Sequence, residues 1–415
     1  MKKPKSPTIT KCESRTLYLT AEEEKILNRE SGEAPATAMR LLVTMGEVFD
    51  ADRLIPIKSA QISGISYKTI GDAGLEFIQD FSRLGAKTSV YTSINPTGMD
   101  LDDWKEIGIP EDFAINQKKI ISALNDIGVE STCTCTPYLL ENIPKYGDHL
   151  AWAESSAVIY ANSVLGAMTN REGGPIALAS AIIGKTPLYG FHIKENRKPT
   201  ISIDVQDELK NELDFSLLGF YIGKKVSGEI PLINLPTGFI NNIFLKTLGA
   251  AMATSGGQAI YHIKDITPES KDFKQEKLRE KITVKRYDLN ETKESLSQEI
   301  DPDIVFIGCP HCSIEEIEEI SEISRGIRFV KKLYVCTSRH VWKIAKSKGY
   351  IDKIEKAGGR VLKDTCMVVT PLERMGISRV MTNSSKAAYY LPTLCKSKAC
   401  LRDLKGCMNY AIDRN

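Results

Sequence analysis

The sequence lacks any long apolar segment. No apolar run approaches the roughly 20 residues that a helix needs to cross a bilayer. The first residues, MKKPKSPTITKCES, are basic and polar and lack the apolar core of a secretion signal. We therefore expect a cytoplasmic protein with no membrane partner.

The sequence also lacks an excess of either charge and is poor in aromatic residues. Its 55 basic and 53 acidic residues nearly cancel, and aromatics make up 7%. Proteins that bind nucleic acid usually carry a strongly basic face. We therefore expect no nucleic-acid partner, and the length of 415 residues predicts a chain of several domains.

Cysteine, in contrast, is plentiful, since the chain holds ten. In a reducing compartment most of these should be free thiols or metal ligands, because disulfides persist mainly in oxidising surroundings. Their positions relative to the expected strands therefore matter.

One segment, 301–319, combines a buried strand with a reactive side chain. The β-branched run 303–308 is typical of a strand, and Ser313 with Glu316 forms a capping box that opens the helix IEEIEEISEIS. Cys309 and the next three residues should then lie in the turn at the carboxyl edge of a parallel sheet, where ligands bind. The helix N-terminus should stabilise a thiolate there.

The segment Cys309-Pro-His-Cys312 is a C-x-x-C motif, which leaves several possibilities open. It could be a thioredoxin-like redox pair, half of a zinc site, or part of an iron-sulfur site completed elsewhere. It could also be two buried thiols that only pack, because free cysteine is often buried.

The first part of the chain alternates strands with helices. We expect strands over 52–58, 87–92 and 129–135, with helices between them, which predicts βαβ units and a parallel sheet. The residues that follow these strands should then meet at one edge: Ser63-Gly64, Asn95 and Cys133/Cys135.

The middle of the chain is less regular. Residues 153–157 open a helix, where Ser155 and Ser156 could receive an anion or simply cap the helix. The Gly-rich loop around Arg171 could hold an oxyanion or be solvated. The Lys- and Glu-rich stretch 265–299 holds one strand-like piece, ITVKRYDL at 282–289, and is expected to be a solvated connection near a domain boundary.

The last part of the chain repeats strand-helix units, with strands expected at 303–308, 332–336, 359–363 and 378–382. Each strand is followed by a cysteine or serine. The thiols placed at strand ends are the candidate ligands, whereas the three cysteines nearest the C-terminus should be structural: Cys135, Cys309, Cys336 and Cys366 belong to the first group, and Cys395, Cys400 and Cys407 to the second.

Cysteines dispersed in this way favour one of the alternatives. A thioredoxin-like pair needs no distant thiols, and zinc usually takes two short ligand pairs, of which only one is present. A cluster on three scattered thiolates uses the dispersed pattern and leaves one iron free to act as a Lewis acid.

Six longer motifs extend this argument: YLTAEEE at 18–24, QISGISYKTIGD at 61–72, TCTPY at 134–138, GCPH at 308–311, DTCMVV at 364–369 and MTNSSKA at 381–387. Together they resemble the aconitase X family, from about residue 17 to the C-terminus. Motifs of this length in this order are highly specific.

The resemblance implies an aconitase-like α/β fold, with several parallel-sheet βαβ domains and a cluster site at strand carboxyl ends. Residues 17–299 would form the core, possibly as two interleaved domains. Residues 300–415 would form a flavodoxin-like domain that carries cluster cysteines, and residues 1–16 a flexible N-terminal extension.

The resemblance also implies a hydro-lyase that dehydrates (R)-5-phosphomevalonate to trans-anhydromevalonate 5-phosphate in the archaeal mevalonate pathway of isoprenoid biosynthesis. A [4Fe-4S] cluster would sit on Cys135, Cys309 and Cys366, with Cys312 and Cys336 as neighbours only. Substrate contacts would fall near Gly64, Ile65, Asn95, Pro96, Glu154, Ser155, Ser384 and Ser385.

No carboxylate or histidine in the sequence is an obvious catalytic base. His311 is expected to hydrogen-bond a cluster sulfur or a backbone carbonyl. The family has a swivelling domain with no counterpart in this sequence, so the resemblance implies a heterodimer with a small subunit whose serine is the base. Alternatives are a cis-3-hydroxy-L-proline dehydratase of the same family and a non-catalytic iron-sulfur or C-x-x-C redox protein.

Overall fold

The computed structural model describes residues 17–412, apart from 237–239, 274–277 and 279. The extension expected over 1–16 lies outside the described residues. Within them, no helix is both long and apolar enough to cross a membrane. The strands form three parallel sheets and one short antiparallel pair, so the predicted α/β class with several parallel sheets is confirmed.

The first unit begins with two helices, α1 (Ala21–Leu27) and α2 (Glu33–Val48). Thr20 and Glu23 form a capping box at the start of α1. The unit continues with a parallel sheet in the order β3-β2-β4 and with four further helices. Their bounds are β2 (Ser59–Ile62), β3 (Tyr91–Ile94), β4 (Leu150–Trp152), α3 (Tyr67–Arg83), α4 (Glu111–Ile127), α5 (Ser155–Tyr160) and α6 (Gly174–Ile183).

Of the three strands predicted in this unit, two are right only in part and one is wrong. The strand expected over 87–92 is β3, which begins only at Tyr91. Of residues 52–58, only β1 (Leu54–Pro56) is a strand, and it pairs antiparallel with β5 (Lys185–Pro187) outside the parallel sheet. Residues 129–135 form no strand, although the amide of Thr134 donates to the Ile94 carbonyl at 2.9 Å.

The segment 129–135 leaves strand geometry for a local reason. The Thr132 hydroxyl, not a backbone carbonyl, accepts from the Ile94 amide at 3.0 Å. Cys133 has a φ of +44°, a left-handed conformation that cannot continue a ladder. The segment still runs beside β3 and places Cys135 at the same edge of the sheet.

The second unit is a four-stranded parallel sheet in the order β8-β7-β6-β9. The stretch 265–299 is more than the solvated connection expected from its charge, since it supplies the edge strand β9 and the helix α9. The bounds are β6 (Ile201–Val205), β7 (Pro231–Asn234), β8 (His262–Ile263), β9 (Lys281–Val284), α7 (Glu212–Lys225), α8 (Asn242–Gly256) and α9 (Arg286–Leu296).

The third unit is a five-stranded parallel sheet in the order β12-β11-β10-β13-β14. Its direction of progression reverses between β10 and β13, the point at which such sheets bind ligands. The edge strand β14 was not predicted. The bounds are β10 (Ile304–Cys312), β11 (Lys332–Thr337), β12 (Arg360–Lys363), β13 (Arg379–Thr382), β14 (Lys398–Leu401), α10 (Ile314–Ile323), α11 (Arg339–Ser347), α12 (Tyr350–Lys356), α13 (Ser385–Leu394) and α14 (Leu404–Ile412).

The sequence predicted that strand β10 ends at Gly308. In the structure it continues through Cys312. Its register with β11 shifts between Ile307 and Cys312. Gly308 has a φ of +100°, and a Cβ there would lie 2.2 Å from the Cys336 carbonyl oxygen, so only glycine fits. The C-x-x-C segment is therefore the irregular end of a buried strand rather than a turn.

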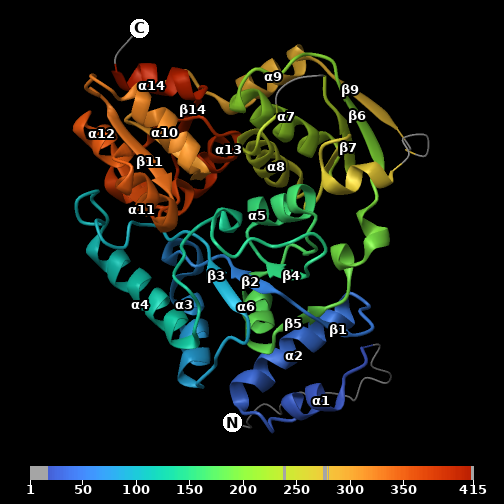
Figure 1. The fold of residues 1–415 in the computed structure, drawn as a ribbon. Helices are drawn as coiled ribbons and strands as arrows, with labels where there is room; N and C mark the ends of the chain where they lie inside the picture. The colour runs from blue at the N-terminus through green and yellow to red at the C-terminus, as the bar shows by residue number, and fades with distance from the viewer. Residues whose placement is uncertain (1–16, 237–239, 274–277, 279, 413–415) are drawn as a thin grey trace, which may run out of the picture.

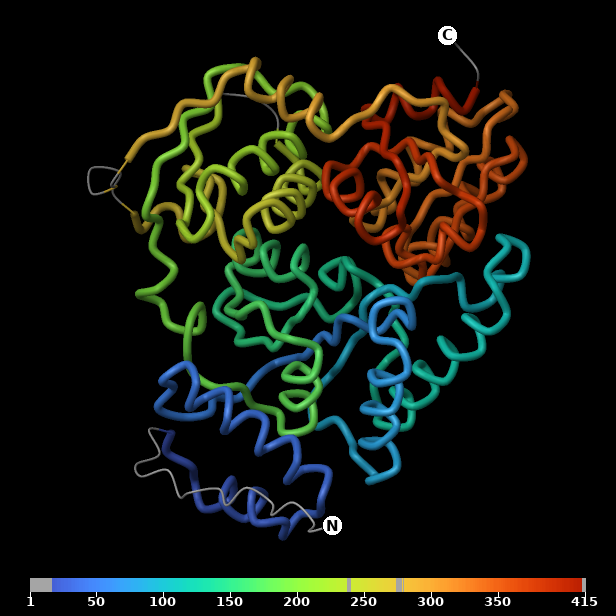
Figure 2. The backbone as a smooth tube through the Cα atoms, turned by 180° about the vertical axis from the view of Figure 1, so that it is seen from behind, coloured from blue at the N-terminus to red at the C-terminus, as the bar shows by residue number. Residues whose placement is uncertain are grey.

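Figures 1 and 2 show the three units meeting around α5 and α13. One hydrophobic cluster spans all three, with Trp152 from the first, Ile203 from the second and Phe306 from the third. Because the units share a core, side chains far apart in the sequence meet at fixed positions between them.

Candidate active site

A cavity of about 310 Å³ lies where the carboxyl ends of β2 and β3 face the irregular end of β10. Most of the residues singled out from the sequence line it: Gly64, Ile65, Asn95, Pro96, Cys135, Glu154, Ser155, Cys309 and Cys366. Ser384 and Ser385 do not, although both are buried nearby. The shared edge expected for Ser63-Gly64, Asn95 and Cys135 is therefore present.

Three separate segments bring the thiols to this cavity. Cys135 follows the irregular segment beside β3, Cys309 lies at the end of β10, and Cys366 comes three residues after β12 ends. Within the described residues all cysteines are free thiols. Cys312 and Cys336 are buried and do not line the cavity.

The thiols are not stabilised as thiolates by the protein alone. Burial raises the pKa of Cys135 to about 12 and also raises that of Cys309, although Lys386 and the Ser384 hydroxyl act in the opposite direction. The sequence predicted that the helix N-terminus would stabilise a thiolate at Cys309. In the metal-free chain this prediction is wrong, because desolvation raises the pKa of the thiol by more than the nearby positive charge lowers it. Metal binding would have to displace the protons.

The thiols fit a cluster better than a single ion. Among the described residues, no group of three His, Cys, Asp or Glu side chains is arranged to hold one metal ion. A polynuclear iron-sulfur group instead takes each cysteine on a different iron, so its thiols stand further apart. Cys135, Cys309 and Cys366 supply three thiols from three segments at one cavity, and thiols are the donors that such a group takes.

His311 ties the three cysteine-bearing segments together. It follows Cys309 by two residues, and its amide donates to the sulfur of Cys135 at 3.2 Å. Its Nε2 donates to the carbonyl of Thr365 at 2.8 Å, next to Cys366. A carbonyl only accepts, so Nδ1 carries no proton and accepts from the Thr134 hydroxyl at 3.2 Å. The predicted bond to a backbone carbonyl is thus confirmed.

Replacing His311 by asparagine is expected to destabilise the metal-free chain by about 3 kcal/mol, because it leaves buried partners unsatisfied. A cluster bound by the three thiols would also be lost faster. His192, which is buried and contacts His149, offers a matched control. Thermal unfolding and iron content check this: His192→Asn should reduce stability but not iron retention, and equal iron loss in both variants would contradict it.

A buried ion pair forms one wall of the cavity. The Lys386 ammonium, from the first turn of α13, lies 2.6 Å from the Glu154 carboxylate at the start of α5. The Asn95 amide donates to the other Glu154 oxygen at 2.7 Å, and the Ser156 hydroxyl donates at 3.0 Å. The Glu154 carboxylate is thus held by three contacts, from Lys386, Asn95 and Ser156, before any ligand binds.

This network sets the charge state of both partners. Burial would raise the pKa of Glu154, but Lys386, Asn95 and Ser156 hold it at about 2. Burial would lower the pKa of Lys386, but the Glu154 charge raises it above its usual value. The pair therefore stays ionised at neutral pH, and Glu154 is a poor base.

Lys386 was not among the functional residues predicted from the sequence. It follows the serine pair in the motif MTNSSKA and stands in the first turn of a helix, where the helix dipole disfavours a cation. That unfavourable placement was the signal that could have identified it. Arg171, for which two roles were open, lines the cavity and adds a second cation.

The remaining polar groups are arranged for a ligand. With its amide nitrogen held by Glu154, Asn95 keeps a buried Oδ1 that has no hydrogen-bond partner among the described residues. Ser155 lines the cavity, whereas Glu154 is the residue that caps α5, because its carboxylate accepts from the Ser156 amide at 3.4 Å. The capping role that the sequence left open for the serines therefore belongs to Glu154. The cavity can thus take an anionic, hydroxyl-bearing molecule beside three thiols.

Comparison with known proteins covers nearly the whole chain. Family models match it in three parts: "Aconitase X first domain" over 16–195, "Aconitase X second domain" over 199–294 and "Aconitase X third domain" over 302–413. The division expected at 299/300 stays a prediction.

Curated relatives and a solved structure agree with these models. The chain is 52% identical over 398 residues to the "Phosphomevalonate dehydratase large subunit" of Methanocaldococcus jannaschii, covering 94% of this chain and 98% of the relative. It is 33% identical to the "Cis-3-hydroxy-L-proline dehydratase" of Pseudomonas aeruginosa, covering 95% of this chain and 70% of that protein. The crystal structure of the holo-form of Thermococcus kodakaraensis aconitase X superposes with a TM-score of 0.89 at 44% identity, covering 95% of this chain and 100% of that one.

Proposed function

The chain belongs to the aconitase X family of dehydratases, and we propose that it is the large subunit of an enzyme that converts (R)-5-phosphomevalonate into trans-anhydromevalonate 5-phosphate. The 52% identity to a phosphomevalonate dehydratase large subunit, over 98% of that subunit, carries the proposal. The product would serve an archaeal mevalonate pathway.

The cavity supports a cluster-dependent dehydration. Cys135, Cys309 and Cys366 would hold a [4Fe-4S] cluster, which when bound supplies an iron without a protein ligand that acts as a Lewis acid. The chain itself binds and orients the substrate. Its contacts would involve Gly64, Ile65, Asn95, Pro96, Glu154, Ser155, Ser384 and Ser385, with Lys386 added by the geometry.

The charges of the cavity suit an anionic substrate. Lys386, Arg171 and the N-terminus of α5 stand at the cavity and favour negative charge, and the ionised Glu154 carboxylate, 2.6 Å from Lys386, offsets part of their positive charge. The free Oδ1 of Asn95 would accept a hydrogen bond from a substrate hydroxyl. Burial of Lys386 keeps water away from that charge and strengthens its attraction for the substrate.

The base is proposed to come from a partner. Dehydration needs a group that removes a proton from the carbon next to the carboxylate, and Glu154, with a pKa of about 2, is too weak a base. No histidine is found among the described residues that line the cavity. We therefore place the base on a serine of a small swivelling-domain subunit in a heterodimer.

A second substrate has support from two of the curated relatives. Cis-3-hydroxy-L-proline is the substrate named for the relative at 33% identity. That relative is longer, since this chain covers 70% of it, whereas the chain covers 98% of the phosphomevalonate relative. The phosphorylated hydroxy acid is therefore the first candidate.

One assay tests substrate and partner together. The chain is loaded with iron and sulfide and offered each substrate, with and without its small subunit. We expect dehydration of (R)-5-phosphomevalonate by the pair and no turnover by the large subunit alone. Preference for cis-3-hydroxy-L-proline would overturn the substrate, and turnover without the small subunit would overturn the heterodimer.

A further inference from the structure

The loop before α4 crosses from the first unit to the third beside Cys366. Directly after Asn95-Pro96, the amide of Thr97 donates to the Asp364 carbonyl at 2.8 Å. The amide of Cys366 donates back to the Thr97 carbonyl at 3.1 Å, and Thr97 pairs with Thr365 as a parallel bridge. A piece of sheet therefore joins the substrate side of the cavity to the segment that carries one thiol.

Asp100 fastens the same loop to the end of β12. Its side chain is 1% exposed, and one carboxylate oxygen accepts from the amide of Lys363 at 3.1 Å. The other oxygen accepts from the amides of Asp102 and Asp103 at 3.0 and 3.1 Å, which fixes the turn of the loop itself. The Lys363 ammonium lies 2.9 Å from the Asp103 carboxylate.

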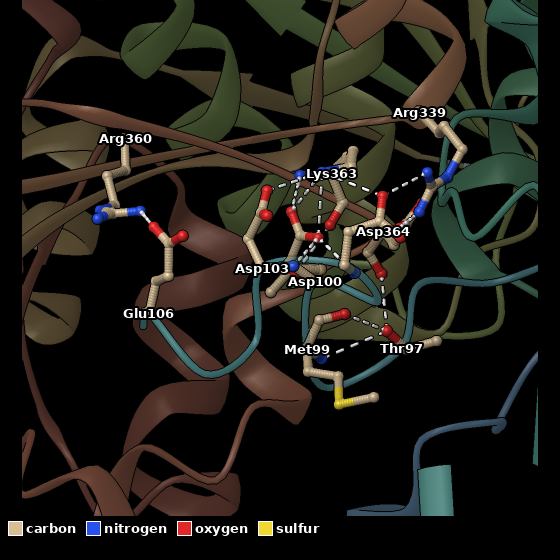
Figure 3. Close-up of polar contacts among 11 residues, drawn as sticks. Thr97, Met99, Asp100, Asp103, Glu106, Arg339, Arg360, Lys363 and Asp364 are labelled. Atoms are coloured by element: carbon tan, nitrogen blue, oxygen red, sulfur yellow. Dashed lines mark hydrogen bonds and ion pairs between the residues drawn. The ribbon is translucent and has the colours of Figure 1, made fainter. Parts of the chain in front are cut away.

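Asp364 makes the turn that carries the chain from β12 to Cys366. Its φ of +64° is left-handed, a conformation that a side chain adopts only at some cost. Its fully buried carboxylate is held by the guanidinium of Arg339, which also reaches Asp102 at 2.8 Å. Figure 3 shows these side chains converging from both units.

We propose that this group, Thr97, Asp100, Arg339, Lys363 and Asp364, is an interdomain latch that positions the Cys366 thiol relative to the rest of the cavity. These are positioning residues, since they act through the backbone that leads into Cys366 and touch no lining thiol. That Cys366 holds a cluster rests on the proposed function. The latch itself is a property of the metal-free chain.

The geometry explains why the position needs fixing. Cys366 is partly exposed, whereas Cys135 and Cys309 are buried. It belongs to the third unit, while Asn95 and Cys135 belong to the first. If the two units shifted against each other, Cys366 would move away from the shared cavity, and the latch opposes that shift at the residues next to it.

The same interface provides a matched control. Arg360 and Glu106 form an ion pair at 2.6 Å between the same strand and the same loop, and both side chains are largely exposed. Figure 3 shows this pair apart from the latch. Removing it takes away one interdomain ionic contact without changing any contact of the Cys366 segment.

The test compares Asp100→Asn with Glu106→Gln in the full chain. In metal-free protein, the rate at which N-ethylmaleimide labels Cys366 is measured by mass spectrometry of its peptide. We expect Asp100→Asn to speed this labelling about tenfold, the effect of losing one hydrogen bond to a charged group. Glu106→Gln should leave it unchanged. Thr97→Val is a second variant if Asp100→Asn fails to fold.

A second measurement connects the latch to the cluster. After reconstitution with the small subunit, the bleaching of the visible cluster absorbance in air should be faster in Asp100→Asn and unchanged in Glu106→Gln. Equal labelling rates in the two variants would overturn the latch. If labelling differs but wild-type protein binds no cluster, the latch stands and the proposed function fails.

Discussion

Replacing Cys135 by serine is expected to abolish turnover and to prevent assembly of a complete cluster. Of the three lining thiols, Cys135 is the one whose sulfur accepts from the His311 amide. Removing a Lewis-acid metal forfeits several kcal/mol of transition-state stabilisation. A loss of that size corresponds to a rate reduction of about 10³-fold or more.

The control for this variant is Cys336→Ala. Cys336 is also fully buried and close to the same region, but it does not line the cavity. It should lose some stability and keep both iron and turnover. Iron and sulfide content, the visible spectrum and dehydration in the presence of the small subunit are the measurements. Turnover retained in Cys135→Ser, or lost equally in Cys336→Ala, would refute the assignment of the thiols.

Replacing Lys386 by methionine is expected to reduce both stability and activity. The change leaves the buried Glu154 carboxylate without its cation, which costs about 3 to 5 kcal/mol of unfolding free energy. Losing a charged contact to an anionic substrate should lower kcat/KM by about 10²-fold. The pKa of Glu154 should rise at the same time, because its lowering depends on Lys386.

A second substitution separates the two effects. In Lys386→Met/Glu154→Gln no unpaired charge remains, so stability should return while activity stays low. Lys185→Met is the matched control, since Lys185 pairs with the buried Glu23 at 2.7 Å, away from the cavity. That variant should lose stability and keep kcat/KM. Recovery of activity in the double variant would show that Lys386 has only a structural role.

The elements around the site were largely predictable from local patterns. The β-branched run before Gly308 and the capping box at Ser313 and Glu316 predicted the start of β10 and of α10. The positions of Ser63-Gly64, Asn95 and Cys135 relative to the expected strands predicted that they share one edge of the first sheet. Such signals are visible because hydrophobic periodicity and helix caps act within a few residues.

The failures have equally local causes. Residues 129–135 carry the composition of a strand, but their side chains replace part of the ladder, as Thr132 does for Ile94. In the charged stretch 265–299, the strand-like piece 282–289 overlaps β9 only as far as Val284, because the helix α9 begins at Arg286. Composition alone does not locate the residue at which a strand gives way to a helix.

The sequence by itself determined the βαβ units, the three dispersed thiols and, through its motifs, the family. Only the tertiary structure decided which charges meet in the cavity. Lys386 contacts Glu154 across 232 residues, and Thr97 contacts Asp364 across 267. Such pairs leave no periodic trace along the chain, because what brings them together is the packing of the three units on one shared core.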